Sequence, residues 1–250
     1  MLALVLLAVI MIVSTILNAV APMPGFSFFV PMFAAFMSTE QAITFAMIWF
    51  MLNSLVLTWS LRGHLRADLI GKLLPASILG GVAGALFTTR INELLLTAVL
   101  LVFVVYFFSK RLRIHTKSGE QSAAKRPKGR STVAVGLFSG FLQGGGFGGG
   151  DVRNNYLYAH DLTLTEVRAT TAAVGSAIFV LSLTTRTIEG TFTVSHAWVF
   201  ALLIPLSIFA AYLGKHITHK LSDKVQHRII VVLMAVSITL LLHKLLGLVS

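Results

Sequence analysis

The densest group of residues able to do chemistry follows a glycine-rich stretch in the middle of the chain. Six glycines lie between Gln143 and Asp151, and Arg153, Asn154 and Asn155 come directly after. The guanidinium of an arginine presents a planar fork of N–H donors that matches an oxyanion. The amides add neutral hydrogen bonds, and Asp151 could orient the arginine or offset its charge while no anion is bound. The group therefore predicts an anion site with Arg153 as its main ligand.

The composition places this group in a membrane. Of the 250 residues 56% are hydrophobic and 12% are charged, with a mean hydropathy of +0.86, whereas soluble domains carry about 25% charged residues. Several apolar runs approach the ~20 residues that cross a bilayer. They do not alternate polar and apolar residues as transmembrane β-barrels do. We expect an all-α polytopic membrane protein with about eight to ten membrane helices, which include the segment that starts at Met1, since it lacks the basic region of a signal peptide.

Several partners and cofactors are not expected. The net charge of +11 does not indicate nucleic acid, because the surplus lies in loops, where lysine and arginine set membrane orientation. The chain has no cysteine, which excludes disulfides and cysteine-ligated metal sites. His216, His219 and His227 lie in a basic loop without a carboxylate or thiol to complete a metal site, so we expect solvated surface. No metal and no cofactor are predicted.

The apolar segments occur twice in the same order. An offset of 125 pairs the helix-start sequences at 38–41 and 163–166, and an offset of 130 pairs 75–84 with 205–214. Ordered matches of this kind indicate duplication. The small residues of the second pair are expected to let helices pack closely and to do nothing more. The chain is divided into membrane repeat 1 (1–109), a basic linker (110–131) and membrane repeat 2 (132–250).

Loop charges predict how the repeats are oriented. The linker is expected in the cytoplasm. Counting helices outward puts the basic loops 61–68 and 215–228 on the same side, and the neutral loops 89–93 and 186–195 outside. Equivalent helices then run in opposite directions, so the repeat is expected to be inverted.

Two segments are too short to cross the membrane. As helices, 26–37 and 152–160 would be about 18 and 14 Å long. Each is expected to pair with the preceding segment as a broken helix; whether the pairs are re-entrant hairpins or full crossings stays open. Transporters with inverted repeats bind substrates at such breaks. The breaks at Pro22–Gly25 and Gly144–Gly150 should therefore face each other near the midplane.

The predicted substrate site lies between these breaks. Thr44 and Thr170 could line its cavity or make hydrogen bonds between helices, and a structural alternative for Arg153 is an ion pair with Asp151 or snorkelling to the interface. The predicted binding residues are Arg153, Asn154, Asn155, Asp151, Gln143, Gly144, Gly145, Gly146, Gly149, Gly150, Asn18, Pro24, Gly25, Ser27, Thr44 and Thr170.

Two stretches match enzyme motifs but lack the structural context that those enzymes need. Residues 144–149 match the dinucleotide fingerprint, which needs a βαβ unit that is not expected here. Residues 148–151 resemble the Gly-x-Gly-Asp element of intramembrane aspartyl proteases, but the other aspartates fall in loops or at helix ends, away from a shared site. An enzyme is not expected.

The duplicated pattern around a basic loop resembles the sulfite exporter TauE/SafE family over nearly the whole chain, most specifically in residues 135–150. Tyr156, where the family has proline, and Pro22–Gly25, where it has a triple glycine, depart from that pattern. The resemblance implies a bacterial inner-membrane permease for sulfite, a sulfonate or a related organic anion. The expected partners of such a permease are the small anion, a coupling H⁺ or Na⁺, membrane lipid and a second copy of the chain. The alternatives are a non-transporting membrane subunit or partner protein and, less favoured, an intramembrane aspartyl protease.

Overall fold

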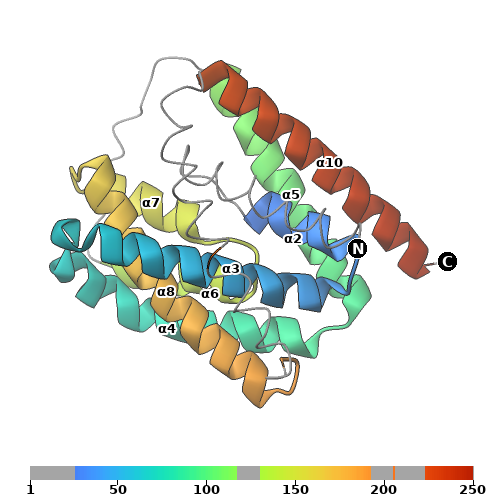
Figure 1. The fold of residues 1–250 in the computed structure, drawn as a ribbon, viewed down its shortest axis with the longest axis horizontal. Coiled ribbons are helices and arrows are strands. Elements are labelled where there is room, and N and C mark those ends of the chain that lie inside the picture. The colour runs from blue at the N-terminus through green and yellow to red at the C-terminus, as the bar shows by residue number, and fades with distance from the viewer. Residues whose placement is uncertain (1–25, 117–129, 193–204, 206–222, 250) are drawn as a thin grey trace.

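The computed structural model describes residues 26–116, 130–192, 205 and 223–249. The expectation of an all-α chain is confirmed, since this part contains helices and no strand. The predicted segments 2–20 and 196–214 lie outside the described residues except for Pro205. The helices are α2 (Phe26–Ala34), α3 (Thr39–Ser60), α4 (Ala67–Arg90), α5 (Glu93–Thr116), α6 (Arg130–Gly144), α7 (Gly150–Tyr158), α8 (Leu164–Ile188) and α10 (Asp223–Val249), with a short 3-10 helix η1 (Arg62–His64) (Figure 1).

Four of these helices are long and apolar enough to cross a bilayer: α3, α4, α8 and residues 231–249 of α10. Residues 93–109 of α5 and 132–144 of α6 are apolar but shorter. The chain is thus a polytopic membrane protein. The total of eight to ten membrane helices stays a prediction, because two of the predicted segments lie outside the described part.

α4 and α6 lie side by side and run in the same direction, with their backbones in close contact. An added Cβ on Gly80 would strike the carbonyl of Leu137, and one on Gly144 would strike the carbonyl of Gly81. Small residues allow membrane helices this approach, which gains dispersion energy where lipid offers no hydrophobic drive. The interpretation of 75–84 as a close-packing run is confirmed. The glycines whose added Cβ would meet the backbone of the other helix are Gly80, Gly84, Gly136, Gly140 and Gly144.

α7 returns along α6 as an antiparallel hairpin. Gly149, just before α7, lies against the backbone of Ser139 in the middle of α6. Tyr156, near the end of α7, shares a 2.6 Å hydrogen bond with Thr132 at the start of α6. α6 therefore begins, and α7 ends, at one end of the bundle, which also holds the start of α4 and which we call the linker end.

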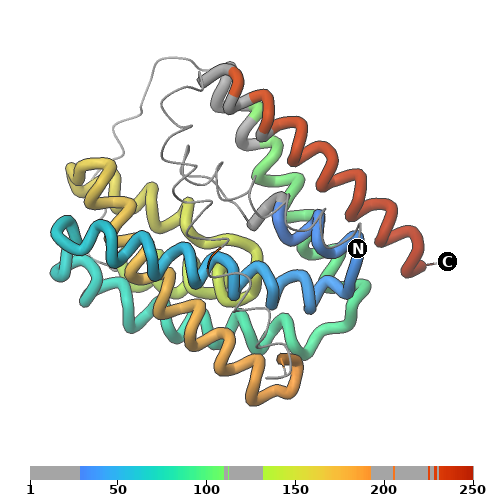
Figure 2. Tube along the Cα trace, viewed as in Figure 1, coloured from blue at the N-terminus to red at the C-terminus, as the bar shows by residue number. Residues whose placement is uncertain are grey.

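Ion pairs at the opposite end, the distal end, join the remaining helices. Arg90 at the end of α4 pairs with Glu189 just after α8 at 3.1 Å. Lys244, near the end of α10, pairs with Glu93 at the start of α5 at 2.8 Å and donates to the carbonyl of Met37, before α3. α3 and α8 therefore run antiparallel to each other, and so do α5 and α10, which lie side by side (Figure 1). Figure 2 shows the same chain path, with α10 (red) across the molecule from α8 (orange).

The main apolar core lies between α2, α3 and α5. Phe29, Trp49 and Leu100 have almost no exposed surface. Phe147, in the turn between α6 and α7, belongs to the same core and stacks on Phe103 of α5 with ring centroids 4.8 Å apart. The hairpin turn is thereby inserted into the packed centre of the described part.

Candidate functional site

The helix break occupies residues 145–149, between the end of α6 and the start of α7. Gly146 and Gly148 have φ angles of 81° and 79°, a left-handed conformation that glycine adopts without steric cost. The turn is closed by a 2.7 Å hydrogen bond from the Phe147 N–H to the Leu142 carbonyl. The prediction of a non-helical break in the glycine-rich stretch is therefore confirmed, and the whole turn is buried.

Arg153 lies one turn into α7 with a side chain that is only 2% exposed. Its Nη2 donates to Oε1 of Gln143, near the end of α6, at 2.7 Å. The Nε2 of Gln143 in turn donates to the carbonyl of Gly175 in the middle of α8 at 2.9 Å. A chain of two hydrogen bonds thus ties the guanidinium to α6 and α8.

The other two nitrogens of the guanidinium, Nε and Nη1, are buried and make no hydrogen bond to the part of the chain that the structure describes. Asp151 and Arg153 are two positions apart in α7, and side chains at this spacing on a helix do not face each other. A buried N–H group without a partner costs about 1–3 kcal/mol, and a charged one costs more. The arrangement can accept the oxygens of a small anion, which would satisfy these donors and the charge together.

Of the other predicted polar ligands in α7, Asn154 bonds to α8, and the rest are at least partly exposed. Oδ1 of Asn154 accepts a 2.6 Å hydrogen bond from Oγ1 of Thr171 on α8. Asn155 is exposed, and Asp151 and Gly150 are partly exposed. Among the predicted ligands, the structure therefore joins Arg153 directly to Gln143.

Most of the glycines predicted to bind substrate are packed closely against neighbouring helices or against the turn itself. Gly144 lies on α4, Gly149 on the backbone of α6, and Gly146 against Ile43 of α3. An added Cβ on Gly145 would crowd the ring of Phe147. These residues shape the break and leave little room for side chains there.

Thr44 and Thr170 make hydrogen bonds within the protein. Oγ1 of Thr44 donates to the carbonyl of Glu40 one turn earlier in α3 at 3.0 Å. Oγ1 of Thr170 accepts from the backbone N–H of Arg66 at 3.3 Å, at the linker end. Of the repeat 1 residues, Asn18, Pro24 and Gly25 lie outside the described part, and Ser27 is described only as a member of α2.

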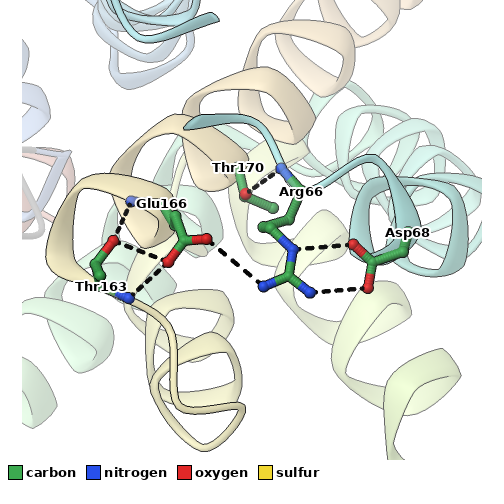
Figure 3. A network of polar contacts seen from close by, with 5 residues as sticks. All are labelled: Arg66, Asp68, Thr163, Glu166 and Thr170. Carbon is green, nitrogen blue, oxygen red and sulfur yellow. Dashed lines mark hydrogen bonds and ion pairs between the residues drawn. The ribbon is translucent and has the colours of Figure 1, made fainter. Parts of the chain in front are cut away.

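Arg66 is also the centre of an ion-pair network at the linker end (Figure 3). It binds Asp68 through Nε at 3.2 Å and Nη2 at 3.3 Å, and its Nη1 lies 3.6 Å from Glu166. The hydrogen bond and the charge of Asp68 raise the pKa of Arg66. Glu166 and Thr163 form the expected capping box at the start of α8, with a 2.9 Å bond from the Thr163 N–H. This exposed network joins the loop before α4 to α8 and is separate from Arg153.

The predicted outside loop 186–195 begins too early. α8 continues to Ile188, and the side chain of Arg186 has no exposed surface. The charge of Arg186 suggests the end of an apolar segment, but Thr187 and Ile188 after it are compatible with a membrane helix and extend α8.

A broken helix with an ionisable side chain buried beside the break is typical of membrane transport proteins. A family model described as sulfite exporter TauE/SafE matches residues 6–241. The chain belongs to this family, whose members are membrane transporters of sulfur anions, and it is thus a transmembrane permease. Neither a curated protein nor a solved structure matches the chain.

Proposed function

We propose that the chain transports sulfite, a sulfonate or a related small organic anion, bound beside Arg153 at the break between α6 and α7. The observation that carries this proposal is the state of the guanidinium. It is buried and held at Nη2 by the neutral Gln143, and its other two nitrogens have no hydrogen-bond partner among the described residues. A side chain placed only for packing would leave no such donors, since buried polar groups are almost always hydrogen-bonded.

The hairpin of α6 and α7 is proposed to be re-entrant. Residues 132–144 span about 20 Å as a helix, less than the ~30 Å hydrocarbon core. Support comes from the hydrogen bond between Thr132 and Tyr156, which keeps both open ends of the hairpin at the linker end. The buried break would then lie at depth in the membrane, where irregular backbone is tolerated only inside protein or beside a watery cavity.

We further propose that the two repeats are inverted and rock against each other. The antiparallel courses of α3 with α8 and of α5 with α10 support this, because the sequence makes each pair equivalent. The break at Pro22–Gly25 would then face Arg153 from the other repeat, contributing shape where repeat 2 contributes charge. Alternating access to a site between repeats is the usual consequence of this architecture.

The linker 110–131 is proposed to lie in the cytoplasm of a bacterium, with the helices in the inner membrane. The support is the excess of lysine and arginine in the linker, as the positive-inside rule requires. The driving force is proposed to be the gradient of the anion itself or of a coupling H⁺ or Na⁺.

The test is transport of radiolabelled sulfite by the purified chain in proteoliposomes. Arg153→Ala is expected to lower the rate at least about tenfold, because a charge-assisted hydrogen bond contributes about 1.5–3 kcal/mol. Arg90→Ala is the matched control, since it removes an arginine whose side chain is 66% exposed in a surface pair. Unchanged transport by Arg153→Ala would overturn the proposed site.

A further inference from the structure

A second buried arginine lies near the distal end of α8. Nη2 of Arg186 donates to Oγ1 of Thr88 on α4 at 2.5 Å. Its Nη1 lies 3.8 Å from Oε1 of Glu40 on α3, which is too long for a hydrogen bond. In the described part of the chain, Nε and Nη1 of Arg186 have no acceptor, and the buried Oε1 of Glu40 has no donor.

Arg186 and Arg153 share this arrangement. In both, Nη2 is held by a neutral side-chain oxygen while Nε and Nη1 stay without an acceptor among the described residues. A residue that only joined helix ends would be expected to use these donors on nearby carbonyls, or to reach the surface with its long side chain. An oxyanion would supply the missing acceptors at Arg186.

Both arginines lie along α8: Arg153 of α7 packs against the middle of this helix, and Arg186 belongs to it. A Cβ on Gly175 would lie 3.4 Å from Nη2 of Arg153, so Arg153 lies at the level of Gly175 on α8. Arg186 follows eleven positions later (186 minus 175), which is about 16 Å along a helix. Arg186 thus lies between the helix break and the distal end of the bundle, on the side opposite the linker end.

Glu40 is placed to compete with an anion for Arg186. It lies in the first turn of α3, and its side chain is 31% exposed while that of Arg186 is fully buried. An anion and the carboxylate would repel each other at this distance. Because Oε1 of Glu40 makes no hydrogen bond in the described structure, the side chain can turn toward solvent without losing one.

We infer that Arg186, Thr88 and Glu40 form a second subsite for a small oxyanion, at the distal end of the route from Arg153. Glu40 neutralises Arg186 when the subsite is empty and gives way when the anion arrives. The ligand is of the class bound at Arg153, a compact anion with at least two oxygens. The inference rests on the proposed transport of such an anion.

The experiment is equilibrium binding of radiolabelled sulfite to the purified full chain in detergent. The wild type is expected to bind two equivalents, and Arg153→Gln and Arg186→Gln one equivalent each. Glu40→Gln is expected to bind two, the distal one on the order of tenfold more tightly, because the like-charge repulsion is removed. Glu189→Gln is the matched control: the same change in a surface pair at the same end should leave both equivalents unaltered.

One equivalent in the wild type that is lost in Arg153→Gln and kept in Arg186→Gln overturns the second subsite and leaves the proposed function standing. No binding to the wild type would overturn the proposed function itself. If Arg186→Gln does not fold, Glu40→Gln decides, since it leaves Arg186 and its bond to Thr88 in place. An affinity unchanged from the wild type in Glu40→Gln overturns the subsite.

Discussion

Gln143 on α6 accepts a 2.7 Å hydrogen bond from Nη2 of Arg153 on α7, across the break that separates the two helices. The amide also donates to the carbonyl of Gly175, so one neutral side chain orients the buried cation and fastens it to α8. A neutral partner holds the guanidinium without cancelling its charge, as the proposed binding and release of an anion would require.

Gln143→Glu should lower transport sharply and also lower the melting temperature, because a carboxylate cannot donate to the Gly175 carbonyl as the Gln143 amide does. The new carboxylate would lie at hydrogen-bond distance from Arg153 and form a buried ion pair, which removes the charge available to the anion. We expect sulfite transport to fall at least about a hundredfold, the effect of losing about 2.8 kcal/mol of binding. Transport in proteoliposomes and the melting temperature check this together. Transport at the wild-type rate would show that the charge of Arg153 is not used.

Gly80→Ala should destabilise the chain through the contact between α4 and α6. The added methyl would overlap the Leu137 carbonyl, and overpacking of this kind costs about 1–3 kcal/mol. Gly71→Ala, in the same helix, is the control, because a Cβ there meets nothing within 4 Å. It should be neutral or stabilising by about 0.5–1 kcal/mol. Thermal unfolding in detergent compares them, and equal melting temperatures would contradict the packing argument.

Gly146→Ala should disturb the break. Its φ of 81° is unfavourable for alanine, at about 1–2 kcal/mol, and the new methyl would also crowd Ile43 of α3. Gly150→Ala is the companion variant, since a Cβ there has open space and the residue begins α7. We expect Gly146→Ala to lower both stability and transport and Gly150→Ala to lower neither. A loss in both variants would instead indicate that the glycines contact the substrate.

Thr163→Ala should weaken the start of α8 without touching the anion site. Oγ1 of Thr163 accepts from the Glu166 N–H at 3.3 Å, and the Glu166 side chain bonds back to the N-cap. Loss of such a cap typically costs about 1 kcal/mol. Thermal unfolding should show the loss, while the affinity for sulfite measured below the melting transition stays that of the wild type. A changed affinity would show that the cap is coupled to Arg153.

The sequence by itself determined which segments become helices and what kind of protein they build. The segments expected at 41–60, 69–88 and 164–185 are the helices at 39–60, 67–90 and 164–188. Long apolar runs with capping residues leave a chain in lipid no other way to satisfy its backbone. The glycine-rich break was also predictable, since such a run of glycines is unusual in a membrane helix. The role of Arg153 as an anion ligand stays a prediction.

Only the tertiary structure decided which groups meet. Gln143 lies ten positions from Arg153 and becomes its partner because the chain folds back on itself through the buried turn. Gly144 proved to lie against Gly81, and Arg186, expected in a loop, is buried between α3, α4 and α8. The physical reason is the same in each case. Burial and pairing depend on how helices distant in sequence pack together, and the spacing of residues along one helix carries no record of its neighbours.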